Sequence, residues 1–373
     1  MKEITGKSLI AGRWQAENTG SRFTAFNPIK NQALQQEFYN VSEREVEQAC
    51  AAAEACFEEF AYTSKEVKAQ LLNTIAEQIL ELGEQLILTT HQETGLPIGR
   101  LEGERGRTVN QLRAFAALLL SPLDVIAGKI SEQADPGRQP LPKPATQLDN
   151  LPLGPVAVFG ASNFPYAFST AGGDTASALA AGCPVVVKGH PAHPATSELV
   201  AGAILKSLDL CNLPQGIFSL LQTNEVEPSH QLVKHPAIKA VGFTGSFAVA
   251  QHLQNSINER QESIPLYGEL GSINPQILLP EIMSRKGNEL AETLTQSLLM
   301  GQGQFCTSPG VWLIPETGQG FIDHVAAYIE QQSSAPLLTP GIKSTYDRGV
   351  DKLSSVPGVN IVGQSQTQED FHA

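Results

Sequence analysis

The chain has 373 residues, 41% of them hydrophobic, and its 25 basic residues against 38 acidic residues give a formal net charge of −13 at pH 7. This length is too great for one ordinary hydrophobic core and predicts two or more domains, while the hydrophobic content excludes a wholly disordered chain. The acidic balance argues against a nucleic-acid partner, because such partners require basic patches.

The first third of the chain is predicted to be helical. Ser42 with Glu45, and Thr63 with Glu66, match the pattern of a capping box, in which a hydroxyl and a carboxylate satisfy the first free amides of a helix. We therefore expect one helix from Ser42 to about Phe60 and a second helix after Thr63.

Further helices and a change of character follow. The second helix carries apolar residues at helical spacing between Leu71 and Leu82, a third helix is expected to stop at Gly95, and a fourth covers about 98–120. Residues 121–155 are rich in proline, which predicts either a linker or a protruding arm with short edge strands.

From residue 156 onward, short apolar runs alternate with helical segments. We expect strands at 156–160, 184–188, 216–221 and 239–243, and helices at 171–181, at 196–208 and from Ser246. Apolar strands separated by helices predict a parallel sheet with right-handed crossovers, and thus an α/β fold. The pattern recurs at 275–279, 290–300, 311–314 and 321–329, which predicts the start of a second α/β domain.

Parallel sheets bind ligands at the carboxyl ends of their strands. Three such ends stand out, at 160–165, 188–191 and 242–246, and none of them matches a standard dinucleotide or phosphate-loop motif. Gly245 and Ser246 open a helix whose N-terminus could face a phosphate. Lys188 fits either a solvated strand end or a cation for a ribose or phosphate, and Asn163 fits either a turn or an amide donor to an oxyanion.

Two further residues could carry chemistry. Cys306 lies in a flexible, polar segment in which Gly301 and Gly303 would leave room for a substrate, although a lone cysteine can equally be an inert buried side chain. Glu269 follows a strand between Gly268 and Leu270, so it is either an exposed turn acid or a general base.

The remaining cysteines and the first residues bear on the compartment. The five cysteines are irregularly spaced and form no CxxC pair, which predicts reduced thiols without a zinc site; they are Cys50, Cys56, Cys183, Cys211 and Cys306. No segment is apolar over the roughly 20 residues that span a bilayer, and Met1 to Lys7 lacks the apolar core of a secretory signal. We expect a cytosolic (cytoplasmic) protein that does not bind membranes.

Taken in order along the chain, these residues resemble the aldehyde dehydrogenase superfamily. The resemblance begins near Ile10 and runs to the end of the chain; its motifs are matched at 163–165, 243–246, 269–271 and 301–306. The segments 160–165, 169–176, 188–191 and 303–307 resemble the 2-oxoglutarate semialdehyde (2,5-dioxopentanoate) dehydrogenases and, equally, the NADP-preferring fatty aldehyde dehydrogenases of luminous bacteria.

The resemblance implies a site and a reaction: the oxidation of an aldehyde to a carboxylate. Cys306 would be the nucleophile that forms a thiohemiacetal, Asn163 with the Cys306 amide would hold the oxyanion, and Glu269 would activate the water that hydrolyses the thioester. The cofactor-binding residues implied are Ser162, Phe164, Lys188, His190, Gly245 and Ser246. The resemblance implies a small-molecule aldehyde as substrate and no metal.

Two departures bear on the cofactor. Many NAD-using members carry a glutamate three residues after the lysine, and here Pro191 stands in its place. The loss of that carboxylate, with Lys188 and His190 adding positive potential, predicts that NADP is accepted and preferred, with NAD possible. Ala250 stands where the pyrophosphate turn often has a second glycine, and a slight helix shift would accommodate its methyl group.

The family is longer than this chain, with a later Glu-x-Phe motif and a C-terminal strand that the sequence lacks. We therefore expect a C-terminally truncated chain with a cofactor-binding domain at 1–120 and 156–265, a protruding oligomerisation arm at 121–155, and a partial catalytic domain at 266–373. Complete members would form homo-oligomers through the arm, an assembly that truncation puts in question. Two alternatives stay open: an inactive remnant that only binds cofactor, and a thiol esterase that uses Cys306 and Asn163.

Overall fold

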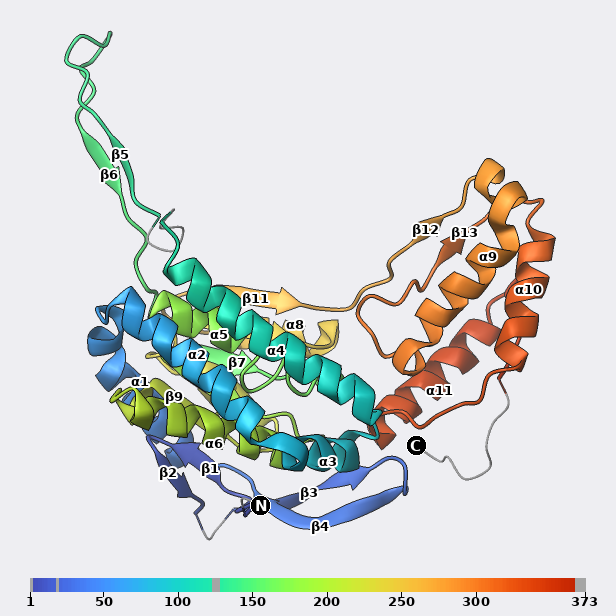
Figure 1. Ribbon diagram of the computed structural model, residues 1–373, viewed down its shortest axis with the longest axis horizontal. Helices are drawn as coiled ribbons and strands as arrows, with labels where there is room; N and C mark the ends of the chain where they lie inside the picture. The colour runs from blue at the N-terminus through green and yellow to red at the C-terminus, as the bar shows by residue number, and fades with distance from the viewer. Residues whose placement is uncertain (1–2, 18–19, 123–127, 366–373) are drawn as a thin grey trace.

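The computed structural model describes residues 3–17, 20–122 and 128–365 (Figure 1). A large sheet flanked by helices forms one part of the molecule, a long hairpin projects from it, and a smaller group of strands and helices follows the last strand of the sheet (Figure 1). The tail from 366 onward lies outside the described residues.

The large sheet has the strand order β11-β10-β7-β8-β9-β1-β2. Five neighbouring strands are parallel: β7 (Val156–Phe159), β8 (Val185–Lys188), β9 (Phe218–Leu221), β10 (Ala240–Thr244) and β11 (Leu266–Glu269). The predicted strands at 156, 184, 216 and 239 are thereby confirmed.

The prediction of a purely parallel sheet is wrong at one edge. β1 (Ser8–Ile10) pairs antiparallel with β9, with Leu9 opposite Leu220, and β2 (Arg13–Gln15) pairs antiparallel with β1. The two are joined through Ala11 and Gly12, whose φ angles of 45° and 81° suit a two-residue hairpin turn. The edge is further fixed by Glu198, whose carboxylate accepts the amides of Thr5 and Gly6 at 2.6 and 2.9 Å.

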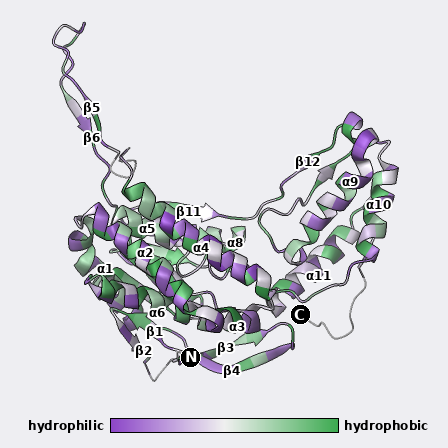
Figure 2. Cartoon of the chain, in the orientation of Figure 1, coloured by the Kyte–Doolittle hydropathy of each residue, from purple (hydrophilic) through white to green (hydrophobic). Residues whose placement is uncertain are grey.

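Helices cover both faces of the large sheet. They are α1 (Glu43–Ala61), α2 (Lys65–Glu81), α3 (Gly83–Thr94), α4 (Ile98–Leu119), α5 (Gly173–Ala181), α6 (Pro194–Leu210), α7 (Glu227–Lys234) and α8 (Phe247–Asn258), with a short 3-10 turn at Gln215–Ile217. Val185 and Val187 face a core shared with α2 to α6, whereas Val186 faces a core shared with α1, α7 and α8. In Figure 2, α2 and α4 carry both hydrophilic and hydrophobic patches, as expected of helices that bury one face.

The predicted helix caps are confirmed in part. Both bonds of the capping box between Ser42 and Glu45 are present, and the third helix stops at Gly95, which has a φ of 69°. The capping box between Thr63 and Glu66 is wrong: Ser64 caps α2 by accepting the amide of Val67. The Thr63 hydroxyl instead donates to the carbonyl of Glu59 at the end of α1.

Two hairpins lie outside the large sheet. β5 (Ile130–Glu132) and β6 (Thr146–Leu148) pair within the predicted arm, which projects well away from the helices (Figure 1). β3 (Arg22–Asn27) and β4 (Gln32–Tyr39) form a second hairpin that was not predicted. Residues 123–127 of the arm lie outside the described residues.

The last part of the chain forms a smaller α/β unit. β12 (Gln276–Ile277) and β13 (Trp312–Leu313) are parallel. Between them in the chain lie α9 (Pro280–Leu299) and a 3-10 turn at Met300–Gly303, and after β13 come α10 (Gln319–Glu330) and α11 (Pro340–Ser354). Leu278, Phe321 and Val325 form its small core. The predicted second α/β segment is present, and α11 extends it beyond the prediction.

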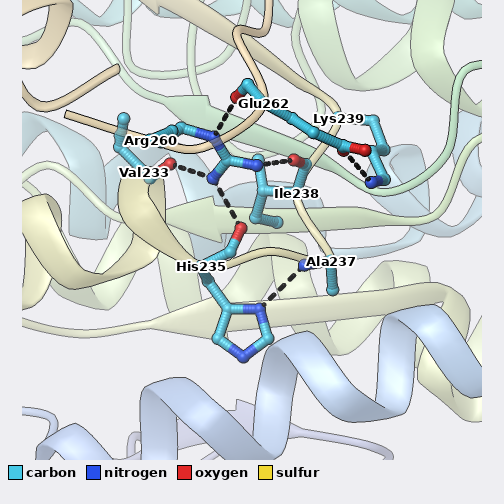
Figure 3. Close-up of polar contacts among 7 residues, drawn as sticks. All are labelled: Val233, His235, Ala237, Ile238, Lys239, Arg260 and Glu262. Atoms are coloured by element: carbon cyan, nitrogen blue, oxygen red, sulfur yellow. Dashed lines mark hydrogen bonds and ion pairs between the residues drawn. The ribbon is translucent and has the colours of Figure 1, made fainter. Parts of the chain in front are cut away.

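Arg260 fixes the turn that leads into β10 (Figure 3). Its guanidinium donates to the main-chain carbonyls of Val233, His235 and Ile238 at 2.6 to 2.8 Å, and its Nε donates to that of Glu262. Because β10 ends at Thr244, this clamp holds the strand that delivers Gly245 and Ser246 to the edge of the sheet.

Candidate active site

The loop after β7 brings Asn163 to the carboxyl edge of the sheet. Its side-chain amide donates to the main-chain carbonyl of Gln304 over 2.8 Å, and Gln304 is two residues before Cys306 in the chain. The main-chain carbonyl of Asn163 accepts from Arg100 of α4 over 2.6 Å. Asn163 and the cysteine segment, far apart in sequence, are therefore brought together.

A buried carboxylate of α4, that of Glu104, binds the loop that contains Asn163. Oε1 of Glu104 accepts the main-chain amides of Tyr166 and Ala167 at 2.9 and 3.0 Å. Burial raises the pKa of Glu104, and the two amides and the nearby Arg100 and Arg107 oppose that rise. The path of the loop is thus fixed by α4.

The cysteine segment has an unusual backbone. Gly301, Gln302 and Gly303 all have positive φ, between 58° and 74°, a region that glycine adopts freely and glutamine only at a cost. A side chain at Gly301 would lie 2.5 Å from the Phe305 ring. The expectation that Gly301 leaves room for substrate is therefore wrong, because that space holds Phe305.

Cys306 itself is half-buried, with a free thiol. Its carbonyl accepts from the side-chain amide of Asn274 over 2.7 Å and from the hydroxyl of Ser272. On the other side, Gln304 accepts the amide of Leu338 over 3.0 Å. Together with the bond from Asn163, these contacts hold the segment to three separate parts of the chain.

Glu269 is the last residue of β11 and is exposed. Its main-chain carbonyl accepts the amide of Gly245 over 3.0 Å, and Ser272, three residues later, contacts Cys306. Glu269 therefore stands at the same edge of the sheet as the 243–246 segment, and the turn that follows it contacts the main chain of Cys306 through Ser272.

Lys188 ends β8, the neighbour of β7. Burial lowers the pKa of its ammonium group to about 8, so it is mostly protonated at neutral pH but loses its charge in mildly basic solution. The described residues provide no salt bridge to it. The structure thus leaves a positive charge at the strand end.

His190 does not carry the positive charge expected of it. Burial, His193 and Lys188 lower its pKa well below the usual value, so the imidazole is neutral near pH 7. Its Nδ1 accepts the amide of Ala192 over 3.2 Å, and its ring stacks on His193 at 5.4 Å between centroids. The positive potential at this edge comes from Lys188, and His190 offers a neutral Nε2–H donor.

The helix that begins after Gly245 opens to solvent. Ser246 caps α8 by accepting the amide of Val249 over 3.3 Å, and residues 245–249 are exposed. Ala250, the departure noted above, is buried in the core beneath α8. The exposed N-terminus of α8 lies at the same edge of the sheet as Lys188, because β10 and β8 are the two parallel neighbours of β7, and it fits an anionic group such as a pyrophosphate.

Two residues assigned to the cofactor lie on the Asn163 loop. Ser162 and Phe164 are both half-buried. The Phe164 ring packs edge-to-face on Phe305 at 5.1 Å and on Phe168 at 5.3 Å. In this structure Phe164 joins the Asn163 loop to the cysteine segment.

Comparison with known proteins identifies the family. The model of the aldehyde dehydrogenase family matches residues 14–341. The chain belongs to the aldehyde dehydrogenase family.

Two relatives within this family are similar over almost all of the chain. Alpha-ketoglutaric semialdehyde dehydrogenase 2 of Azospirillum brasilense is 42% identical over 98% of this chain and 70% of its own length. Alpha-ketoglutaric semialdehyde dehydrogenase of Acinetobacter baylyi is 40% identical over 99% of this chain and 70% of its own length. The chain thus spans about 70% of the length of these relatives.

Solved structures of the family share the fold. Aldehyde dehydrogenase C of Pseudomonas syringae, solved with NAD+ and octanal, has a TM-score of 0.82 at 21% identity, covering 99% of this chain and 73% of its own. Betaine aldehyde dehydrogenase of Staphylococcus aureus has a TM-score of 0.85 at 19% identity, covering 99% of this chain and 72% of its own. The α/β fold predicted from the sequence is confirmed.

Sequence reasoning missed the residues that hold this aldehyde dehydrogenase site together. Arg100, Ser272 and Asn274 act through contacts with residues 32 to 63 positions away, which no local pattern reports. Of these three residues, Asn274 alone carried a local sequence signal, because an asparagine before a proline favours a turn; in the structure its φ is 48°.

The search of the described residues for membrane segments gave a negative result: none of their helices combines the length and apolar character that crossing a bilayer requires.

Proposed function

We propose that this aldehyde dehydrogenase oxidises 2-oxoglutarate semialdehyde (2,5-dioxopentanoate) to 2-oxoglutarate with a nicotinamide cofactor. The observation that supports the proposal is the 2.8 Å bond from the Asn163 side-chain amide to the main-chain carbonyl of Gln304, in the segment that carries Cys306. The substrate is supported by two relatives, 42% and 40% identical, that are named for it.

The chemistry begins at Cys306. Its thiolate attacks the aldehyde carbon and forms a carbon–sulfur bond, while the carbonyl oxygen becomes an oxyanion. The Asn163 side-chain amide turns from the Gln304 carbonyl toward that oxygen, and the main-chain amide of Cys306 is the second donor. These donors stabilise the thiohemiacetal and favour the collapse that expels a hydride.

The cofactor would be held at the carboxyl edge of the large sheet. The exposed N-terminus of α8 at Gly245 and Ser246 would bind its phosphates, and Lys188 with the Nε2–H of His190 would bind the ribose or its 2′-phosphate. When bound, a nicotinamide cofactor accepts the hydride from the aldehyde carbon. NADP would be preferred, because Pro191 removes a carboxylate that would repel the 2′-phosphate.

Glu269 completes the cycle. Its carboxylate takes a proton from water, the resulting hydroxide attacks the thioester carbon, and the Cys306 thiolate leaves as the carboxylic acid forms. Its exposed position at the end of β11 leaves it accessible to water.

The same proposal assigns a separate role to each of three parts of the chain. Residues 1–120 and 156–265 would bind the cofactor, residues 266–373 would supply Glu269 and Cys306, and the hairpin within 121–155 would pair copies of the chain. Homo-oligomerisation through that arm and a cytosolic location remain predictions.

The test is aldehyde-dependent reduction of NADP or NAD by the 373-residue chain, followed at 340 nm. We expect turnover with 2,5-dioxopentanoate to exceed turnover with decanal, to be faster with NADP than with NAD, and to vanish in Cys306→Ala. Faster turnover of decanal would instead assign the chain to fatty aldehydes. Ester hydrolysis without cofactor, with no cofactor reduction, would assign it to the thiol esterases.

A further inference from the structure

Arg100 lies at the point where the two halves of the site meet. It is in the first turn of α4 and is half-buried. Its guanidinium donates to the carbonyl of Asn163 over 2.6 Å, and its central carbon lies 4.5 Å from the Phe305 ring centroid and 5.2 Å from that of Phe164. One cation thus contacts both the oxyanion loop and the residue next to Cys306.

The charge of this guanidinium is poorly compensated. Burial lowers the pKa of Arg100, and it makes no salt bridge with any carboxylate of the described residues. Glu104, one helical turn later, attracts it without forming a salt bridge: its Oε1 accepts the amides of Tyr166 and Ala167, and its buried Oε2 has no hydrogen-bond partner among the described residues. A partly desolvated cation with unused donors favours an anion that arrives with the substrate.

We propose that Arg100 binds the carboxylate of the substrate, at the end opposite the aldehyde that Cys306 attacks. This inference rests on the proposed function, because 2,5-dioxopentanoate carries one carboxylate beside its 2-oxo group. Of the five N–H donors of a guanidinium, one is committed to Asn163, so the planar fork retains donors for two carboxylate oxygens. The packed rings of Phe164 and Phe305 would lie on one side of the short carbon chain.

A purely structural role makes a different prediction. If Arg100 only fastens the Asn163 loop to Phe305, its loss lowers turnover of every aldehyde alike. If it binds the carboxylate, its loss raises KM for the anionic aldehyde and leaves a neutral aldehyde of the same length nearly unaffected. The two roles therefore separate on substrate charge.

The experiment compares Arg100→Met and Arg100→Lys with the wild-type chain, using 2,5-dioxopentanoate and pentanal. Arg107→Met is the matched control, because Arg107 lies two turns later on α4, is exposed, and stacks on Phe168 at 4.8 Å. We expect Arg100→Met to lower kcat/KM for the anionic aldehyde about 30-fold or more, through KM, and that for pentanal less than about 3-fold. Arg100→Lys should restore part of the loss and Arg107→Met should behave as wild type.

Binding of 2-oxoglutarate, measured by calorimetry, gives a second readout that needs no turnover. We expect Arg100→Met to weaken it at least about 10-fold, with circular dichroism unchanged. An equal loss of activity on both aldehydes, or unchanged affinity for 2-oxoglutarate, would overturn the role of Arg100. Wild-type protein that binds 2-oxoglutarate in an Arg100-dependent manner but oxidises neither aldehyde would instead overturn the proposed function alone.

Discussion

The side-chain amide of Asn163 and the main-chain carbonyl of Gln304 lie 2.8 Å apart, although the two residues are separated by 141 positions in the chain. The bond joins the loop after β7 to the segment that carries Cys306. Without substrate, the amide thus has a protein acceptor, which it would exchange for the oxyanion.

Asn163→Ala is expected to reduce kcat by about 10²–10³-fold, because one donor to the oxyanion is lost. KM should change much less, since the oxyanion exists only after attack. Steady-state kinetics with 2,5-dioxopentanoate measures both, and Ser177→Ala, at an exposed position of α5, is the control. A variant that lost affinity but kept kcat would contradict the role of Asn163.

Cys306 should react with iodoacetamide before the three buried cysteines. Burial raises the pKa of Cys50 and Cys56 to about 12, so these two present almost no thiolate at pH 8, and burial also raises the pKa of Cys183. Cys306 is half-buried and lies in the candidate site. Peptide mass spectrometry of a time course measures each site, and Cys50 modified as early as Cys306 would show the assignment to be wrong.

Pro191→Glu is expected to weaken NADP binding about 10-fold or more and to affect NAD less, because a carboxylate would then face the 2′-phosphate. Pro191→Gln is the uncharged control. NADP affinity of the wild type should also fall as the pH rises through about 8, where Lys188 loses its proton. Fluorescence titration with both cofactors measures these effects, and an unchanged NADP-to-NAD ratio would refute this account of cofactor choice.

Glu93 of α3 should make the stability depend on pH. Its carboxylate accepts the amides of Ala195 and Thr196 at the start of α6, and burial raises its pKa to about 7. Between the ordinary value of 4.5 and about 7, the folded chain holds a proton that the unfolded chain has released. Stability therefore falls as the pH rises through this window, by about 3 kcal/mol from this group.

Glu93→Gln cannot release that proton, so its urea midpoint should vary less between pH 5 and pH 7.5 than that of the wild type. The variant should also be less stable overall, because its side-chain nitrogen cannot accept an amide. Parallel pH profiles for the two proteins would contradict the assignment.

Arg260→Met should destabilise the part of the chain that contains β10. It removes a guanidinium that binds the carbonyls of Val233, His235 and Ile238, at a cost of about 2–4 kcal/mol. Lysine has no planar fork, so Arg260→Lys should recover little of the loss. Urea unfolding followed by tryptophan fluorescence measures both variants; Arg138→Met, in the exposed arm, should leave the midpoint unchanged.

Helices and buried strands were predictable where one local signal dominates. The apolar runs ending at Phe159, Lys188 and Leu221, and the glycine stop at Gly95, each report on their own neighbourhood. The predicted cap of α2 was wrong because Thr63 and Ser64 are adjacent hydroxyl residues, and which of them caps the helix depends on where α1 ends.

The edge strands and the supporting side chains were not predictable in this way. β1 and β2 have three residues each, too few to show a period, and their place depends on the distant Leu220. Arg100 likewise looks like any helical arginine until the fold brings Asn163 to it. The candidate catalytic residues could be inferred from a family resemblance, whereas the residues that hold them in place could be identified only from the structure.

The position of β1 has a consequence for synthesis of the chain. The Ser8 hydroxyl accepts the amide of Gln222, 214 positions later, and Leu9 pairs with Leu220. At ribosomal rates of 5–20 residues per second, β1 must wait on the order of 10 s or more for β9 to be synthesised. An apolar strand is therefore exposed throughout that time, and the nascent chain is most vulnerable to chaperone capture or aggregation before residue 222 emerges.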